Sequence, residues 1–165
     1  MQHYLPVKRD DPGSFGLEVT FANKQTARGL IDLGASFNIM PYSIYKKMGI
    51  GELQPSKTKL KMADKSQKKA RGLLEDCLVR IGELIVPVDF LVLDLESHDD
   101  EDEEPYLLLG RTFMDTTNME ISMRDETIKM TVRGKTLRLE ISDDNSPPLY
   151  TSKVSTNYFD EVMMK

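Results

Sequence analysis

Short stretches in which every second residue is apolar constrain this chain of 165 residues more than any other feature. In the clearest stretch, Leu17, Val19 and Phe21 alternate with polar residues. This two-residue period is typical of a β-strand with one buried face. Similar stretches recur at the spacing of roughly 8–12 residues that all-β folds show. They cover residues 26–31, 37–40, 58–62, 67–70, 73–81, 84–93, 106–109, 119–123, 128–132 and 137–141.

One short segment breaks this pattern and predicts a helix. Pro41 can open a helix, residues 42–48 form its body, and Gly49 is a typical C-terminal stop. In a later stretch, Pro87 predicts an edge position or a β-bulge, because proline cannot donate to a ladder of hydrogen bonds. About ten short strands and one short helix predict an all-β, barrel-like domain.

The negative charge of the chain lies in one segment. Lysine and arginine number 22 and aspartate and glutamate 27, which gives a net charge of −5. Seven acidic residues fall between Glu96 and Glu104, so the rest of the chain carries +2. Such close carboxylates repel one another, and we predict a solvated, mobile loop outside the barrel. A divalent-cation site is the alternative, although the segment lacks the glycine and ligand alternation of a calcium loop.

The remaining composition argues against several classes of site. A single cysteine, Cys77, excludes an intrachain disulfide, and we expect a buried structural thiol. His3 and His98 have no partner at metal-ligand spacing, so we predict no metal and no cofactor. A basic cluster spans residues 57–71, where the solvated face of a hairpin is favoured over a nucleic-acid site.

Three regions are predicted along the chain. Residues 1–10 form an N-terminal extension, residues 11–141 one domain, and residues 142–165 a flexible tail that follows a linker rich in Asp, Asn and Pro. The sequence shows neither a signal peptide nor an apolar run long enough to span a bilayer. We therefore expect an intracellular, cytoplasmic protein with no membrane partner.

Two apolar strands end in residues that suggest a shared site. Asp32 follows the apolar stretch that ends at Ile31, and Gly34 permits a sharp turn or a close approach. By itself this is most often an ordinary turn aspartate. Far downstream, a second apolar strand ends in Gly110-Arg111. We predict that Asp32 and Gly110 lie at neighbouring strand ends of the barrel.

Several segments, in order, resemble the retropepsins, the retroviral-type aspartic proteases. The resemblance covers residues 11–141 and extends in particular to the protease region of gag-pol polyproteins from plant gypsy-type LTR retrotransposons. It rests on residues 30–41, 61–66, 72–76, 86–94 and 107–114. It implies a small closed β-barrel of the half-pepsin type with one or two short helices.

The resemblance also implies the roles of individual residues. Asp32 would be the catalytic aspartate, within a loop completed by Leu33, Gly34, Ala35 and Ser36. A hairpin tip, the flap, would close over a peptide substrate. The flap residues would be Ala63, Asp64, Lys65 and Ser66, and the support of the active-site loop would come from Leu108, Leu109, Gly110 and Arg111.

The chemistry requires two carboxylates that share a proton, one acting as base toward water and the other as acid toward the substrate. The only other Asp-x-Gly, at Asp11, follows no apolar strand and is interpreted as a turn. One active loop per chain implies a symmetric homodimer. The predicted function is an aspartic endopeptidase that cleaves a polyprotein.

A departure from the family pattern supports the main alternative. Leu33 stands where active members usually have Thr or Ser, whose hydroxyl bonds across the dimer. The alternative is therefore an inactive dimerisation module of the same fold, or a retrotransposon remnant. A third interpretation, the ubiquitin-linked retropepsin-like class, ranks last.

Overall fold

The computed structural model describes residues 5–9, 15–61, 65, 67–95 and 104–140. Several predicted features lie wholly or partly outside these residues. They are three flap residues (Ala63, Asp64 and Ser66), most of the acidic segment (96–103), the tail (142–165), the turn at Asp11 and half of the N-terminal extension.

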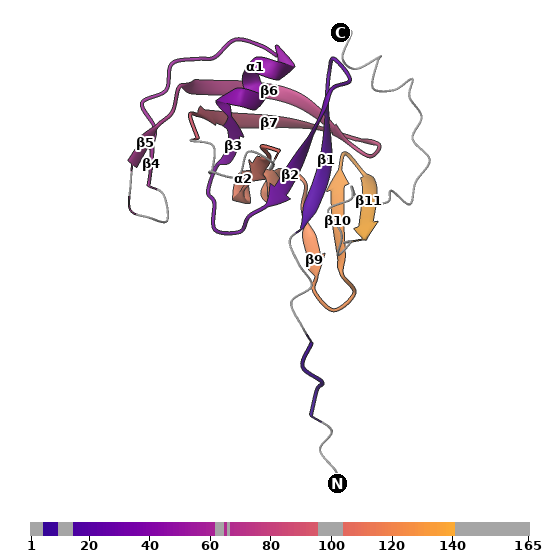
Figure 1. The fold of residues 1–165 in the computed structure, drawn as a ribbon. Coiled ribbons are helices and arrows are strands. Elements are labelled where there is room, and N and C mark those ends of the chain that lie inside the picture. The colour runs from indigo at the N-terminus through magenta and orange to yellow at the C-terminus, as the bar shows by residue number, and fades with distance from the viewer. Residues whose placement is uncertain (1–4, 10–14, 62–64, 66, 96–103, 141–165) are drawn as a thin grey trace.

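Six strands close into a barrel in the order β1-β2-β8-β3-β7-β6 (Figure 1). Their bounds are β1 Gly16–Phe21, β2 Thr26–Ile31, β3 Asn38–Pro41, β6 Gly72–Ile81, β7 Leu84–Leu93 and β8 Leu107–Leu109. The alternating side chains of the first strand, Leu17, Val19 and Phe21, are buried in the core. The predicted closed β-barrel is thereby confirmed.

Five further strands lie outside the barrel. A two-stranded hairpin consists of β4 (Lys59–Lys61) and β5 (Gln67–Lys69). A separate sheet, beside the barrel in Figure 1, has the order β11-β10-β9. Its bounds are β9 Glu120–Ser122, β10 Thr127–Val132 and β11 Lys135–Glu140. The described residues thus contain eleven strands. The alternation of apolar and polar residues along them does not show which strands close the barrel.

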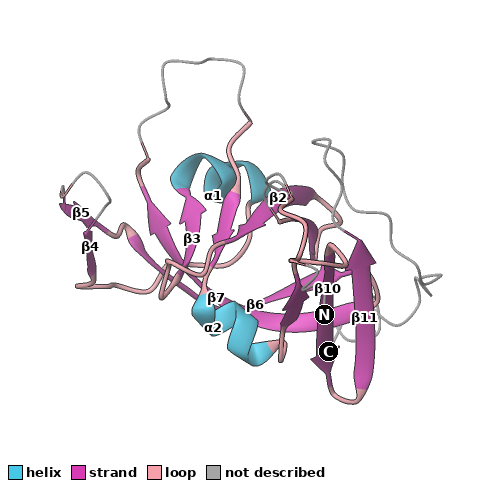
Figure 2. Cartoon of the chain, turned by 90° about the horizontal axis from the view of Figure 1, so that it is seen from below, coloured by secondary structure: helices cyan, strands magenta, loops and turns pink. Residues whose placement is uncertain are grey.

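Two helices lie on opposite sides of the barrel strands (Figure 2). The first, α1 (Tyr42–Met48), ends as predicted: Gly49 has a left-handed φ of 60°, and its N–H donates to the Tyr45 carbonyl. The second, α2 (Arg111–Thr116), has six residues, too few for an apolar period to reveal it. In the described part of the chain, no helix is long and apolar enough to cross a membrane.

Pro87 occupies the kind of position that its chemistry predicts. At this point β7 pairs only with β6, because β3 joins β7 from Phe90 onward. The facing strand carries a β-bulge between Leu74 and Cys77. An unpaired side and a neighbouring bulge both accommodate a residue without an N–H.

Cys77 is half-buried against the core, whereas the sequence predicts a buried thiol. Burial raises the pKa of its thiol to about 12. We expect slow alkylation of the native protein at pH 8 and fast alkylation in denaturant, because the thiolate is the nucleophile. An ordinary thiol ionises near pH 8.5, so the unfolded chain loses this proton first. The free energy of unfolding should therefore fall between about pH 8.5 and pH 12, and a Cys77→Ala variant should lack this component.

Candidate active site

Asp32 lies at the end of β2, beside the strand that ends at Gly110. Strands β2 and β8 are parallel, with Ile31 paired with Leu109. The Asp32 N–H donates to the Leu109 carbonyl over 3.0 Å and extends this pairing by one residue. The predicted meeting of the two strand ends is confirmed.

The loop after β2 folds around the Asp32 carboxylate. The Gly34 N–H donates to Asp32 Oδ1 over 2.8 Å, and the Ala35 N–H donates to the Asp32 carbonyl over 3.2 Å. A Cβ atom on Gly34 would lie 3.1 Å from the same Oδ1, so a larger residue would crowd the carboxylate. Asp32 is half-buried while Leu33, Gly34 and Ser36 are exposed. The carboxylate is therefore fixed by the backbone and still open to a reacting molecule.

Gly110 allows this loop to pack directly against the backbone that follows β8. A Cβ atom at Gly110 would lie 2.5 Å from the Phe37 carbonyl oxygen and 2.7 Å from that of Ala35. Arg111, the next residue, donates two hydrogen bonds to the loop. The Arg111 N–H donates to the Ala35 carbonyl over 2.9 Å, and its Nη1 donates to the Leu33 carbonyl over 2.9 Å.

Asn38 is a site residue that the sequence analysis missed. Its side chain is buried, and its Oδ1 accepts the Gly110 N–H over 2.8 Å. Its Nδ2 donates to the Asp89 carbonyl over 3.1 Å. This amide therefore ties the Gly110 turn to β7. The available signal was an isolated polar residue between Phe37 and Ile39 in an apolar stretch.

The predicted support residues point in two directions. Leu109 is buried in the main core, whereas Leu108 packs with Ile39 and Leu91 in a second cluster. Leu60 of the β4–β5 hairpin packs against the same second cluster. The hairpin thus packs against a cluster that contains side chains of β3, β7 and β8. Of the four predicted flap residues, only Lys65 is described, at an exposed turn with φ of 67°.

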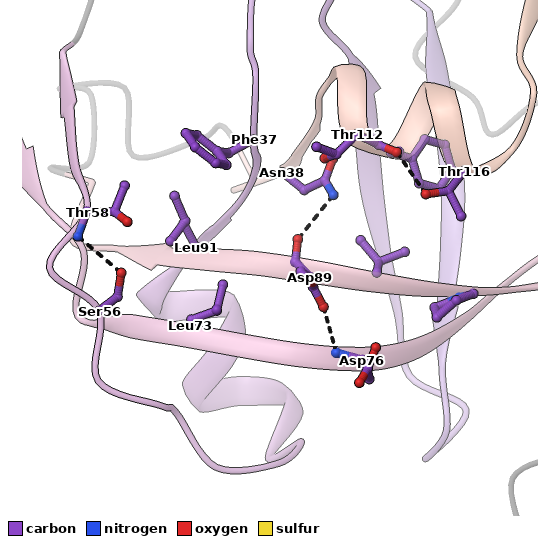
Figure 3. A pocket seen from close by; sticks show the side chains of 13 residues that line it. Phe37, Asn38, Ser56, Thr58, Leu73, Asp76, Asp89, Leu91, Thr112 and Thr116 are labelled. Atoms are coloured by element: carbon purple, nitrogen blue, oxygen red, sulfur yellow. Dashed lines mark hydrogen bonds between the residues drawn. The ribbon is translucent and has the colours of Figure 1, made fainter.

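A cavity of about 460 Å³ lies beside this loop. Phe37, Thr58 and Leu91 line one end, and Asp89 and Thr116 lie toward the other (Figure 3). The cavity extends from Phe37, at the end of the loop after Asp32, to the segment with Ser56 and Thr58 that precedes the hairpin. Its apolar and polar walls together suit a side chain of a bound peptide.

The described part of the chain has no cluster of potential metal ligands. No group of three or more His, Cys, Asp or Glu side chains there could hold a metal ion. What the geometry offers is a single carboxylate in a turn held by backbone hydrogen bonds, and a cavity whose lining begins at Phe37, five residues farther along the chain.

Comparisons with known proteins identify the fold and the family. A family model described as aspartyl protease matches residues 17–113. The retroviral protease-like domain of Ddi1 from Leishmania major is similar in structure, with a TM-score of 0.55 and 15% identity over 87% of this chain and 99% of that one. The EIAV protease, solved with the inhibitor HBY-793, has a TM-score of 0.51 and 15% identity over 71% of this chain and 100% of that one. These low identities show the fold alone. No curated protein matches the chain.

The family match has stronger consequences than the structural likeness. It spans more than half of the chain and includes the loop at Asp32, β8 and the start of α2. The chain therefore belongs to the aspartyl protease family.

Proposed function

We propose that this chain is an aspartic endopeptidase that acts as a homodimer, with Asp32 of each chain forming the catalytic dyad. The observation that carries the proposal is the Asp32 carboxylate itself, fixed by the Gly34 N–H and reachable from outside. In a pair, one carboxylate removes a proton from the attacking water while the other protonates the substrate. The reaction needs such a pair because each carboxylate takes a separate role.

The dimer follows from the number of carboxylates that the chemistry needs. The described part of the chain contains one loop of this kind. Two apolar side chains on it are exposed, Leu33 by 66% and Phe37 by 43%. A second copy that meets this surface about a two-fold axis would cover apolar area and bring the second Asp32.

The other site residues then have supporting roles. Gly34 to Ser36 shape the loop, while Gly110 and Arg111 hold it from behind. The hairpin tip around Lys65 serves as the flap that covers a peptide. The substrate is a peptide segment of a polyprotein, of the kind that gypsy-type retrotransposons encode, and cleavage takes place in the cytoplasm.

A second function has one specific observation in its favour. Leu33 has no hydroxyl to donate across the dimer, and among the described large apolar side chains only Leu5 and Val7 are more exposed. A chain that retained the fold and the dimer surface but lost this hydrogen bond would be an inactive dimerisation module.

The decisive test is cleavage of an unstructured protein at acidic and neutral pH. We expect the protein to sediment as a dimer and to cleave this substrate. A transition-state inhibitor of aspartic proteases should block the cleavage. A proven dimer that cleaves nothing under either condition would favour the inactive module.

Leu33→Thr is expected to strengthen the dimer or to raise turnover. A recovered hydrogen bond contributes about 0.5–1.5 kcal/mol, which corresponds to a gain of roughly two- to tenfold. Because Leu33 is 66% exposed in the single chain, the substitution should leave the melting temperature of the monomer nearly unchanged. Sedimentation and peptide cleavage measure the two gains. Weaker association would show that Leu33 itself packs in the interface.

A further inference from the structure

We propose that Lys68 determines specificity, by presenting its ammonium group from the barrel-facing side of the hairpin to a carboxylate side chain of the substrate. The inference rests on the proposed endopeptidase function and adds a substrate class to it: peptides with Asp or Glu close to the cleaved bond. It is carried by the register, the burial and the charge of the hairpin.

Burial alternates along both strands of the hairpin and identifies its two faces. Leu60 pairs with Lys68, and these two side chains therefore share one face. Leu60 packs on the second apolar cluster, and both are half-buried. On the opposite face, the paired residues Lys59 and Lys69 are exposed. Lys68 thus lies on the side of the hairpin that is turned to the barrel.

The neighbours on this face are uncharged. Thr58 lines the cavity beside Phe37, and Ala70 is buried in the second cluster. The Ala70 N–H donates to the Thr58 carbonyl, which continues the pairing of the two strands. Within residues 58–61 and 67–70, Lys68 is accordingly the one charged side chain on the barrel-facing side.

The charge of Lys68 is not balanced by a described residue. Neither a hydrogen bond nor an ion pair joins its side chain to the described part of the chain. A half-buried lysine side chain with uncharged neighbours can be stabilised by an incoming carboxylate, because a charge-assisted hydrogen bond forms between the two groups. The stem of the lysine can lie along Leu60 while its head reaches the bound peptide.

The cavity restricts where that carboxylate can lie. Asp76 and Asp89 line the cavity away from the hairpin, and the Asp76 N–H donates to Asp89 Oδ1 over 2.8 Å. An acidic side chain would be repelled there. We therefore place the acidic residue of the substrate under the hairpin, near Lys68.

The test uses neighbouring lysines on opposite faces as a matched pair. Denatured proteins of known sequence are digested with wild type, Lys68→Met, Lys68→Glu, Lys69→Met and Lys69→Glu, and mass spectrometry locates the cleaved bonds. We expect wild type to favour sites with Asp or Glu within about four residues of the bond. Lys68→Met should reduce this preference about two- to fivefold, the range of a half-exposed ion pair. Lys68→Glu should shift the preference to sites with Lys or Arg near the cleaved bond. Both Lys69 variants should retain the preference for Asp or Glu.

A wild type without acidic preference, or Lys69 variants that change the profile as much as the Lys68 variants, would overturn the inference. Binding separates this result from a failure of the proposed function. Fluorescence anisotropy with Asp32→Asn compares a short peptide containing glutamates with its glutamine counterpart. The inference is supported, even if wild type cleaves nothing, by two results together. The glutamate peptide binds more tightly than the glutamine peptide, and the Lys68→Glu substitution removes this difference. Equal binding of the two peptides refutes it.

Discussion

Replacement of Asp32 by asparagine is expected to abolish peptide cleavage while the fold remains intact. The asparagine Oδ1 can still accept the Gly34 N–H, so the turn keeps the hydrogen bond that shapes it. The dyad, however, loses the negative charge that removes a proton from water. We expect turnover to fall by more than about a thousandfold, the scale of losing a group that takes part in bond making. Peptide cleavage and the melting temperature are the two measurements.

Asp125→Asn provides the matched control for this change. Asp125 lies in the turn between β9 and β10, where its carboxylate accepts the Ser122 hydroxyl. The substitution removes the same charge outside the barrel and should leave cleavage unchanged. If wild type and Asp32→Asn cleave equally, the activity does not arise from this site.

The position of Asp32 could be predicted because short patterns of neighbouring residues indicate it. An apolar strand that ends in Asp-x-Gly and another that ends in Gly-Arg are each visible in the sequence, and parallel strand ends meet at the same edge. The helix before Gly49 was predictable for the same reason, since cap residues act over a few positions.

The contacts that complete the site depend on long-range packing. Asn38 bonds to Gly110 across 72 positions of the chain, and no periodicity reveals such a pair. The division of the strands into a barrel, a hairpin and a separate sheet is equally hidden. Strands of the separate sheet have the same alternation as barrel strands, because Ile128 and Met130 are also buried in the main core.

Gly110→Ala is expected to be the most destabilising single-methyl change at the site. Its φ of −89° is open to any residue, so the requirement for glycine comes from space rather than from backbone conformation. The new Cβ would meet the carbonyl oxygens of Phe37 and Ala35 at 2.5 and 2.7 Å. Backbone atoms cannot rotate away as a side chain can, and the whole loop must shift.

That shift would break the hydrogen bonds that hold the loop. The Gly110 N–H would lose Asn38 Oδ1, and the Arg111 N–H would lose the Ala35 carbonyl. Overpacking together with a buried amide left unpaired costs about 2–5 kcal/mol, and we expect the melting temperature to fall by roughly 10 °C or more. Cleavage should be lost even at temperatures where the variant is still folded, because the Asp32 loop is displaced.

Gly16→Ala distinguishes this effect from the general cost of replacing a strand glycine. A Cβ atom at Gly16 would meet only the guanidinium end of Arg28, at 3.2 Å, and a flexible side chain can move. We therefore expect Gly16→Ala to shift the melting temperature by a few degrees at most and to retain cleavage. Were Gly110→Ala to unfold at the same temperature as Gly16→Ala and cleave normally, the loop could not be packed on Gly110 as described. The two variants together therefore measure how much of the site depends on this one backbone contact.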